Sequence, residues 1–264
     1  MIPLGQYLPS DTSLHRLDPR VKILSVVALS LLIFGATTGE IVLISVFLFA
    51  AIRSAGMTPA VALRSLKPVA VFMAMIFSVH LLFTEGEPLV SLAPLPMRIT
   101  RDGILRGLFV TWQFAGLVLA AAVLTRTTSP SDLVGGIERL LRPFSRVGVP
   151  SQDIAVMIAM ALRFMPMLME EYDRLRTAQM ARGADFTTGS LLLRGRAIAA
   201  LAVPLLLSSF RRADELAVAM EARGYRRGPR TTLRELRFSG TDLRAFAAMA
   251  LFVLVNFAWK ATMG

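Results

Sequence analysis

The sequence contains no cysteine, only two histidines, and only three lysines among its 29 basic residues. Without cysteine it can form neither a disulfide nor a thiolate metal site. His15 and His80 are far apart along the chain, and there is no His-Glu-x-x-His motif. There is also no Gly-x-x-x-x-Gly-Lys-Ser/Thr loop to hold ATP phosphates. No catalytic residue, metal site or cofactor is therefore predicted.

Apolar residues are abundant, in contrast. The chain of 264 residues is 55% hydrophobic and has a mean hydropathy of +0.60, which is too apolar for a soluble domain and indicates a membrane protein. Its net charge is +11, but the aromatic residues lie in apolar runs and are not interleaved with arginines, so nucleic acid is not predicted as a partner. The N-terminus lacks a basic segment followed by an apolar one, so no cleaved signal peptide is expected.

Five apolar segments are predicted to cross the membrane. They are residues 21–38, 41–52, 68–83, 103–125 and 245–259. Residues 84–102 contain three prolines and are predicted to form an extramembrane loop. The interiors of the five segments contain almost no ionisable group, and His80 is interpreted as an interfacial residue. A proton-coupled or ion-coupled secondary transporter is therefore disfavoured.

Basic residues in the short connections predict the orientation. They precede the first segment, separate the second from the third and follow the fourth: Arg16, Arg20, Lys22, Arg53, Arg64, Lys67 and Arg126. These three places fall on one side, which is predicted to be cytoplasmic. The chain is expected to be a multi-pass protein of the bacterial cytoplasmic membrane, with its N-terminus inside and its C-terminus outside.

Residues 126–243 differ from the rest because they are rich in arginine and in acidic residues. A short amphipathic helix is predicted at 131–141, and a long one at 151–181 with Ser151 as its N-cap. A second long helix is predicted from about Arg196 to Ala222. Both long helices begin apolar and end charged. The sequence favours helices that lie against the inner membrane face or pack on each other, but leaves open whether their apolar halves cross the membrane.

Both long helices end in the same three residues, within a longer repeat. Residues 173–183 and 214–224 are identical at six of eleven positions, 41 residues apart, where chance would give about one. The shared residues end in Ala181-Arg182-Gly183 and Ala222-Arg223-Gly224.

Two interpretations of these triplets remain open. Arg in a last turn and Gly after it are the usual way to end a helix, which explains one copy by itself. Two copies on a common template instead suggest docking. Alanines three apart keep a helix face small enough to enter a groove, and Arg offers five hydrogen-bond donors to a partner. Two copies would suit two equivalent partners.

The sequence resembles the transmembrane coupling (T) component of energy-coupling factor (ECF) transporters, the EcfT family, in its shared-module branch. The resemblance covers nearly the whole chain. It rests on "LHRLDPRVKIL" at 14–24, "LRFMPMLMEEYDRLRTAQMARGADFTTG" at 162–189 and "FRRADELAVAMEARGY" at 210–225. The family's X-Arg-X motifs correspond to Ala181-Arg182-Gly183 and Ala222-Arg223-Gly224.

The resemblance implies an all-α membrane protein with about five transmembrane helices and a cytoplasmic helical coupling domain. Residues 1–125 would hold four transmembrane helices, 126–243 the coupling domain and 244–264 the final transmembrane helix. The two triplets would dock two ATP-binding (A) subunits, and the other side of the same helices would support one or several substrate-binding S components. The membrane part would meet membrane lipid. The chain itself would bind no substrate and hydrolyse no ATP, while the complex would import vitamins or micronutrients.

Three alternatives remain. A conventional ABC importer permease would carry one coupling loop per chain, which the duplicated triplet disfavours. A cobalt- or nickel-dedicated ECF module would share the same architecture. A structural membrane anchor without a transport role is the third. The methionines of the first long helix fit either plain packing or an adaptable surface for interchangeable S components: Met157, Met160, Met165, Met167 and Met169.

Overall fold

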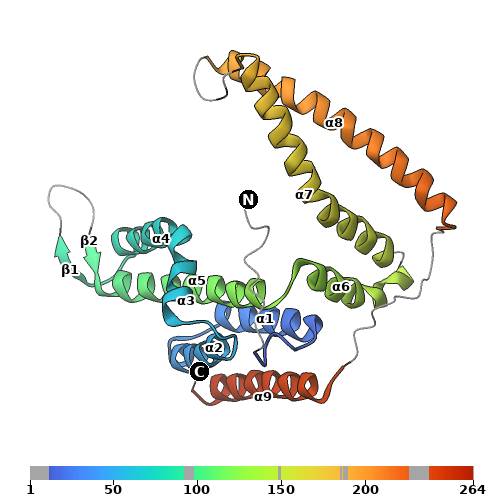
Figure 1. The fold of residues 1–264 in the computed structure, drawn as a ribbon. Helices are drawn as coiled ribbons and strands as arrows, with labels where there is room; N and C mark the ends of the chain where they lie inside the picture. The colour runs from blue at the N-terminus through green and yellow to red at the C-terminus, as the bar shows by residue number, and fades with distance from the viewer. Residues whose placement is uncertain are drawn as a thin grey trace. The chain divides into compact units, whose positions relative to one another are not determined.

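The computed structural model describes residues 12–91, 98–147, 150–184, 186, 190–225 and 238–263. These residues are almost wholly helical, which confirms the predicted all-α class (Figure 1). The chain divides into two compact units. The first comprises residues 1–136 and 234–264, and the second comprises residues 137–233.

The first unit contains most of the helices. Along the chain it contains α1 (Pro19–Phe34), η1 (Thr38–Glu40), α2 (Ile41–Ser54), α3 (Pro59–Leu66), η2 (Lys67–Val69), α4 (Ala70–Phe83), β1 (Pro88–Ser91), β2 (Arg98–Thr100), α5 (Arg101–Thr127), the start of α6 (Pro130–Leu141) and α9 (Gly240–Met263). The second unit contains the rest of α6, then η3 (Arg142–Val147), α7 (Ser151–Ala181) and α8 (Leu191–Ala222).

Four helical stretches of the described chain are long and apolar enough to cross a membrane: Pro59–Phe83, Arg101–Thr127, Gln152–Ala181 and Gly240–Thr262. Three of them contain predicted spans. The fourth is most of α7. The sequence analysis left open whether the apolar half of this helix lies on the membrane or crosses it. The other two predicted spans form α1 and α2, which have 16 and 14 residues.

Helix α1 nevertheless runs alongside α9 for nearly its whole length (Figure 1). At one end, the backbone N–H of Asp18 donates to Asp242 Oδ1 over 2.7 Å. At the other end, Lys260 Nζ donates to the carbonyl of Gly35 over 2.9 Å. Residues 18–35 and 242–260 each span about 26 Å as helix. The two helices therefore run parallel between the same two ends of the bundle. Two membrane spans that enter the membrane from the same side must run in this way.

The third span begins earlier than predicted. The sequence placed its start at Pro68, after a basic loop, but α3, η2 and α4 form a continuous helical stretch from Pro59 to Phe83. Pro68 has no N–H to donate, and the chain passes it as the 3-10 segment η2 instead of ending the helix. Arg64 and Lys67 therefore lie on helical backbone and not in a loop.

Small residues on α5 bring α4 unusually close. Gly103 and Gly107 are four residues apart, the spacing of a Gly-x-x-x-Gly packing motif. A Cβ at Gly103 would lie 2.8 Å from the carbonyl oxygen of His80, and one at Gly107 would lie 3.0 Å from the Phe77 ring. Since real Cβ atoms essentially never approach other atoms to under 3.0 Å, α4 can reach α5 at Gly103 only because this residue is glycine, and a side chain at Gly107 would require the Phe77 ring to shift.

The predicted loop 84–102 contains a short antiparallel pair of strands. Strand β1 pairs with β2 in a register that joins Pro88 to Thr100 and Ser91 to Arg98. Thr100 then caps α5, since its hydroxyl accepts from the N–H of Gly103 over 3.0 Å. Residues 92–97, within this loop, lie outside the described part of the chain.

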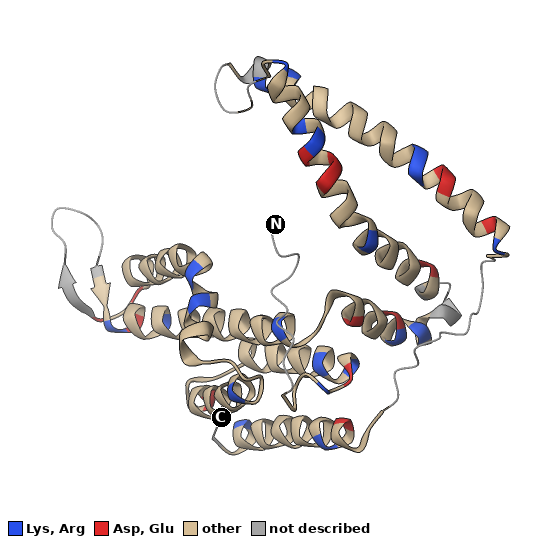
Figure 2. Ribbon diagram, viewed as in Figure 1, with Lys and Arg blue, Asp and Glu red and all other residues tan. Residues whose placement is uncertain are grey.

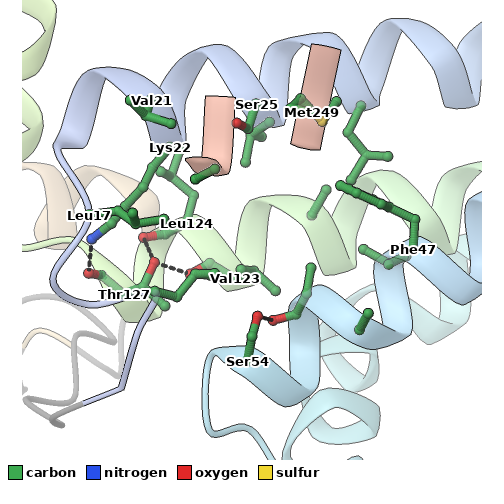
Figure 3. A pocket seen from close by; sticks show the side chains of 18 of the residues that line it. Leu17, Val21, Lys22, Ser25, Phe47, Ser54, Val123, Leu124, Thr127 and Met249 are labelled. Carbon is green, nitrogen blue, oxygen red and sulfur yellow. Dashed lines mark hydrogen bonds between the residues drawn. The ribbon is translucent and has the colours of Figure 1, made fainter. Parts of the chain in front are cut away.

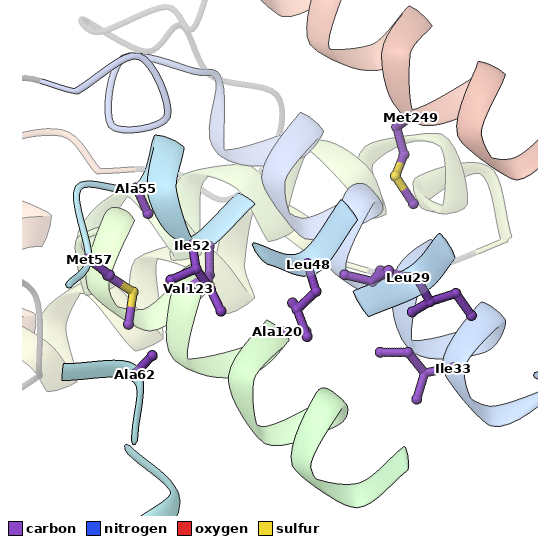
Figure 4. Close-up of a cluster of buried hydrophobic side chains, with 11 residues drawn as sticks. Leu29, Ile33, Leu48, Ile52, Ala55, Met57, Ala62, Ala120, Val123 and Met249 are labelled. Carbon is purple, nitrogen blue, oxygen red and sulfur yellow. The ribbon is translucent and has the colours of Figure 1, made fainter. Parts of the chain in front are cut away.

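A cluster of buried apolar side chains from α1, α2, α5 and α9 forms the core of the first unit (Figure 4). Ile33 and Ile44 are fully buried at its centre, and Ala120 lets α5 approach them. Phe47 of α2 stacks on Phe252 of α9 with ring centroids 4.0 Å apart. These contacts join the first two predicted spans to the last one, although they are far apart in sequence.

Both ends of residues 126–243 belong to the first unit, and a contact explains each. A Cβ at Gly136 of α6 would lie 3.0 Å from Pro19, so the start of α6 packs on α1. The start of α9 is held by the Asp18–Asp242 hydrogen bond. The second compact unit spans residues 137–233.

Two predicted helix starts in the second unit are wrong. Ser151 is the first residue of α7 and not its N-cap, which is Pro150 and makes no side-chain cap bond. Helix α8 begins at Leu191 and not near Arg196, because Arg194 and Arg196 are tolerated inside the first turns. Both helices contain a proline, Pro166 and Pro204, and continue through it.

Candidate functional site

The end of α7 is closed by a Schellman motif, in which the backbone turns back on the last helical carbonyls. The N–H of Gly183 donates to the carbonyl of Met180 over 3.0 Å. The N–H of Ala184 donates to the carbonyl of Gln179, also over 3.0 Å. Arg182 is the C-cap, so its side chain leaves the helix at the turn itself.

The end of α8 repeats this geometry bond for bond. The N–H of Gly224 donates to the carbonyl of Glu221 over 2.9 Å, and the N–H of Tyr225 donates to the carbonyl of Met220 over 3.0 Å. Each donor and acceptor lies 41 residues after its counterpart in α7. The repeat found in the sequence is therefore also a repeat of backbone structure.

Gly183 and Gly224 have φ angles of +85° and +74°, in the left-handed region that the sequence predicted for them. A Cβ at either position would meet no described atom within 4 Å. Backbone conformation, and not crowding, therefore selects glycine here. The glycine part of the capping interpretation is therefore confirmed, and both interpretations of the arginine before each glycine stay open.

All six residues of the two triplets are exposed, and so are Ala178 and Ala219 one turn earlier. The less exposed side of each helix end is also formed by residues at the same position of the repeat, since Leu175 and Leu216 are both partly buried. Each helix end therefore presents a face of small side chains that terminates in an exposed arginine.

The two triplets lie at different ends of the helical pair. Figure 1 shows that α7 and α8 approach each other where α7 ends, and separate toward the end of α8. Apart from Arg194 and Arg196 near its start, the charged residues of α8 lie toward its C-terminal end, beyond a long apolar stretch (Figure 2). The two triplets are therefore held apart within the α7–α8 pair.

One polar contact between α7 and α8 joins equivalent positions of the repeat. Arg212 Nη2 donates to Glu171 Oε2 over 2.6 Å, and Ser208 Oγ donates to Glu171 Oε1 over 3.2 Å. Arg212 also contacts the sulfur of Met167. Residue 208 is 41 after 167, and 212 is 41 after 171, so each helix uses the same two positions. The sequence shows these residues, but not that they meet.

The sequence analysis missed a polar cluster at one end of the first unit. Asp242 caps α9 by accepting from the N–H of Ser239 over 2.7 Å, and also accepts from Asp18 as described above. Lys22 Nζ donates to the carbonyls of His15 and Thr127 over 3.0 and 2.8 Å. Asp18, Lys22 and Asp242 are all buried.

This cluster gives the N-terminal motif at 14–24 a structural role. It ties the start of α1 to the end of α5 and the start of α9. Two local signals pointed to it: Asp18-Pro19 is a helix start, and Ser239-x-x-Asp242 is a capping box. The buried ionisable groups thus lie at helix ends and serve the fold, which explains why the interiors of the predicted spans read as nearly uncharged.

The described residues contain no group of three or more His, Cys, Asp or Glu side chains that could hold a metal ion. The ring of His80 is hydrogen-bonded to the carbonyl of Ile76 in its own helix. Fold and site together define a helical membrane subunit with two repeated, arginine-bearing helix ends.

Comparison with known proteins identifies the family. The chain belongs to the CbiQ family, described as cobalt transport protein, whose model matches residues 10–233. It is 42% identical over 265 residues to the energy-coupling factor transporter transmembrane protein EcfT of Thermosediminibacter oceani, covering 98% of this chain and 99% of the relative. The EcfT proteins of Heliobacterium modesticaldum and Bacillus subtilis are 42% and 35% identical, and each alignment covers 98% of this chain.

Proposed function

We propose that this chain is the transmembrane coupling subunit of an ATP-driven ECF importer. It transmits the closure of two ATP-binding subunits to one or several S components, which carry a vitamin or another micronutrient. The similarity to EcfT proteins over nearly the full length supports this function, as do the two repeated helix ends. ATP hydrolysis and substrate binding belong to the partner chains.

The observation that carries the proposal is the bond-for-bond identity of the two helix ends. A helix stop needs no arginine and no second copy of its surroundings. Two equal docking elements are what two equivalent ATPase subunits require. In each, Ala181 or Ala222 lets the helix end enter a groove, and Arg182 or Arg223 donates to carboxylates or carbonyls within it.

The proposed location is the bacterial cytoplasmic membrane, with the N-terminus inside. The geometry of the first unit supports one common side for the basic segments. The Asp18–Asp242 and Lys22–Thr127 bonds bring the starts of α1 and α9 and the end of α5 to the same end of the bundle. Arg16, Arg20, Lys22, Arg126 and Arg244 lie near these helix ends in sequence, as the positive-inside rule expects for a cytoplasmic face.

A cobalt- or nickel-dedicated ECF module is a second candidate, favoured by the description of the matching family as cobalt transport protein. It would use the same coupling architecture with a different S component. The named relatives are described as energy-coupling factor transporter transmembrane proteins, without mention of a metal. A coupling subunit that is not dedicated to cobalt or nickel is therefore preferred.

Purification from native membranes tests the function. The full-length chain is tagged, extracted in mild detergent, and its bound chains are identified and counted by mass spectrometry. We expect two ATPase subunits for each copy of this chain, with small membrane proteins in lower and variable amounts. Recovery without any ATPase subunit would contradict the coupling role. A single metal-specific S component in every preparation would favour the dedicated module.

A further inference from the structure

The first unit contains a cavity of about 330 Å³ between α1, α2, α5 and α9 (Figure 3). Its walls are mainly aliphatic and aromatic, and include Val21, Leu29, Phe47, Leu48, Val123 and Met249. This volume falls at the lower end of the range for ligand pockets. The cavity belongs to the first unit, whereas the two triplets belong to the second.

The polar groups that border the cavity are largely satisfied by the protein. Lys22 is the one charged residue among its described lining, and its ammonium is held by the carbonyls of His15 and Thr127. The hydroxyls of Ser54 and Thr127 donate to the carbonyls of Ala51 and Val123. Water needs two to four polar partners to stay in a cavity, and an apolar cavity binds apolar molecules instead. The expected occupant is therefore a hydrocarbon chain.

A second hollow, of about 420 Å³, adjoins the cavity and differs from it in chemistry. The two share Leu14, Leu17 and Ala245 as lining residues, so they are neighbours that these side chains border on both sides. The second hollow also has Arg16, Arg244 and the hydroxyl residues Ser13 and Thr241 around it, all of them exposed. An apolar chamber thus adjoins an opening that carries two arginines.

This gradient from apolar to cationic matches one class of molecule in a membrane. We propose that the site binds one anionic phospholipid, with an acyl chain in the cavity and its phosphate between Arg16 and Arg244. Lys22 is buried, whereas Arg16 and Arg244 are exposed around the second hollow, so the anionic group belongs at the opening and not inside. The opening lies at the start of α1 and α9, which the topology proposed above places at the inner leaflet. Anionic lipids populate that leaflet, and basic pockets between helices bind their headgroups.

A titration with two lipids tests the site. The full-length chain, with the partner chains that copurify, is stripped of lipid in detergent. It is then titrated with phosphatidylglycerol or with phosphatidylcholine of the same acyl chains, following thermal stabilisation and counting bound lipid by native mass spectrometry. We expect one tightly bound phosphatidylglycerol and a preference over phosphatidylcholine of roughly thirtyfold, since two arginines act on the headgroup. Equal apparent affinity for the two lipids would overturn the proposal.

Variants at the opening address the headgroup. The double variant Arg16→Gln/Arg244→Gln should bring the two lipids to within about threefold of each other. The matched control Arg53→Gln/Arg64→Gln removes two exposed arginines outside both hollows and should retain the preference. Loss of the preference in both double variants would mean that general charge, and not this site, selects the lipid.

Variants in the cavity address the acyl chain. Ser25→Leu and, independently, Ala51→Leu fill the cavity and should weaken both lipids alike. Ser30→Leu makes the same change on α1 at a residue outside the cavity lining and should leave both unchanged. Inorganic phosphate alone should give no stabilisation. Full stabilisation by phosphate, or unchanged lipid binding in both filled variants, would exclude a lipid whose chain enters the cavity.

Discussion

Glu171 of α7 and Arg212 of α8 form an ion pair of 2.6 Å between equivalent positions of the 41-residue repeat. Their side chains are 27% and 37% exposed, so the pair is only partly shielded from solvent. It nevertheless links the two helices that end in the triplets. If the triplets dock two ATPase subunits, this pair helps set how the two docking points are held relative to each other.

A double-mutant cycle should reveal this pair. We expect Glu171→Ala and Arg212→Ala each to destabilise the chain, with a coupling energy of about 0.5–1 kcal/mol, near the upper limit for partly exposed pairs. Glu170 and Arg174 are the control, because they face each other over 3.7 Å on one helix and are 67% and 81% exposed. Their coupling energy should be about 0.3 kcal/mol or less. Equal coupling in both cycles would show that the Glu171–Arg212 contact has no special role.

The arginines of the triplets should act as two separate anchors. Arg182→Glu or Arg223→Glu alone should weaken assembly with the ATPase subunits but leave part of it, through the other helix end. The double variant should lose assembly and ATP-dependent uptake, because one bound end no longer raises the effective concentration of the other. Loss of a buried charge-pair partner typically costs about 2–5 kcal/mol per site.

Pull-down of ATPase subunits at matched expression measures this loss. The control Arg176→Glu/Arg211→Glu makes the same charge change at exposed sites of α7 and α8, outside the triplets. If the triplets only end the helices, each site contributes about 0.3–1 kcal/mol to helix-end stability and assembly stays almost intact. Near-normal recovery of ATPase subunits with the Arg182/Arg223 double variant would leave that interpretation as the correct one.

The small faces of the helix ends should be sensitive to bulk. Ala181→Trp and Ala222→Trp should block assembly without unfolding the chain, since both alanines are exposed and an indole fills the space that a partner must occupy. Ala217→Trp is a suitable control on α8, because it is exposed and lies about 140° around the helix from Ala222. Copurification of ATPase subunits in normal amounts with both variants would rule out insertion into a groove.

Close packing of α5 on α4 should depend on Gly103. Gly103→Ala places a Cβ against the carbonyl oxygen of His80, which cannot rotate away, and should destabilise the first unit by about 1–3 kcal/mol. Gly240→Ala, at the start of α9, meets no described atom within 4 Å and should change stability by less than about 0.5 kcal/mol. The thermal midpoint of each purified variant, measured in one detergent, compares them. Equal midpoints would contradict the close approach.

The absence of cysteine makes membrane topology straightforward to test. Single substitutions Ser10→Cys, Ser91→Cys, Thr187→Cys and Thr262→Cys are treated with an impermeant thiol reagent on intact cells. Five crossings from an inside N-terminus predict labelling at Ser91→Cys and Thr262→Cys only. Labelling of Thr187→Cys without Ser91→Cys would reverse the orientation. Labelling at Thr187→Cys together with Ser91→Cys would show that α7 crosses the membrane.

The sequence by itself determined the features that depend on local chemistry. Apolar runs predicted a helical membrane protein, and the repeat predicted two equivalent helix ends closed by Gly183 and Gly224. Both follow because hydrophobic length and the left-handed preference of glycine act within a few residues. The starts of the α3–α4 stretch, α7 and α8 were placed less well, since proline and arginine are tolerated in helices when neighbouring elements support them.

Tertiary structure decided what depends on residues far apart in the chain. The bond between Asp18 and Asp242, the contact of Gly103 with His80 and the Glu171–Arg212 pair all join separate helices. The cavity likewise exists only because four helices leave it unfilled. The sequence alone indicates the hydrophobic periodicity and the caps of each helix. It does not indicate which helices pack together, because packing depends on the shapes of the side chains on both contacting helices.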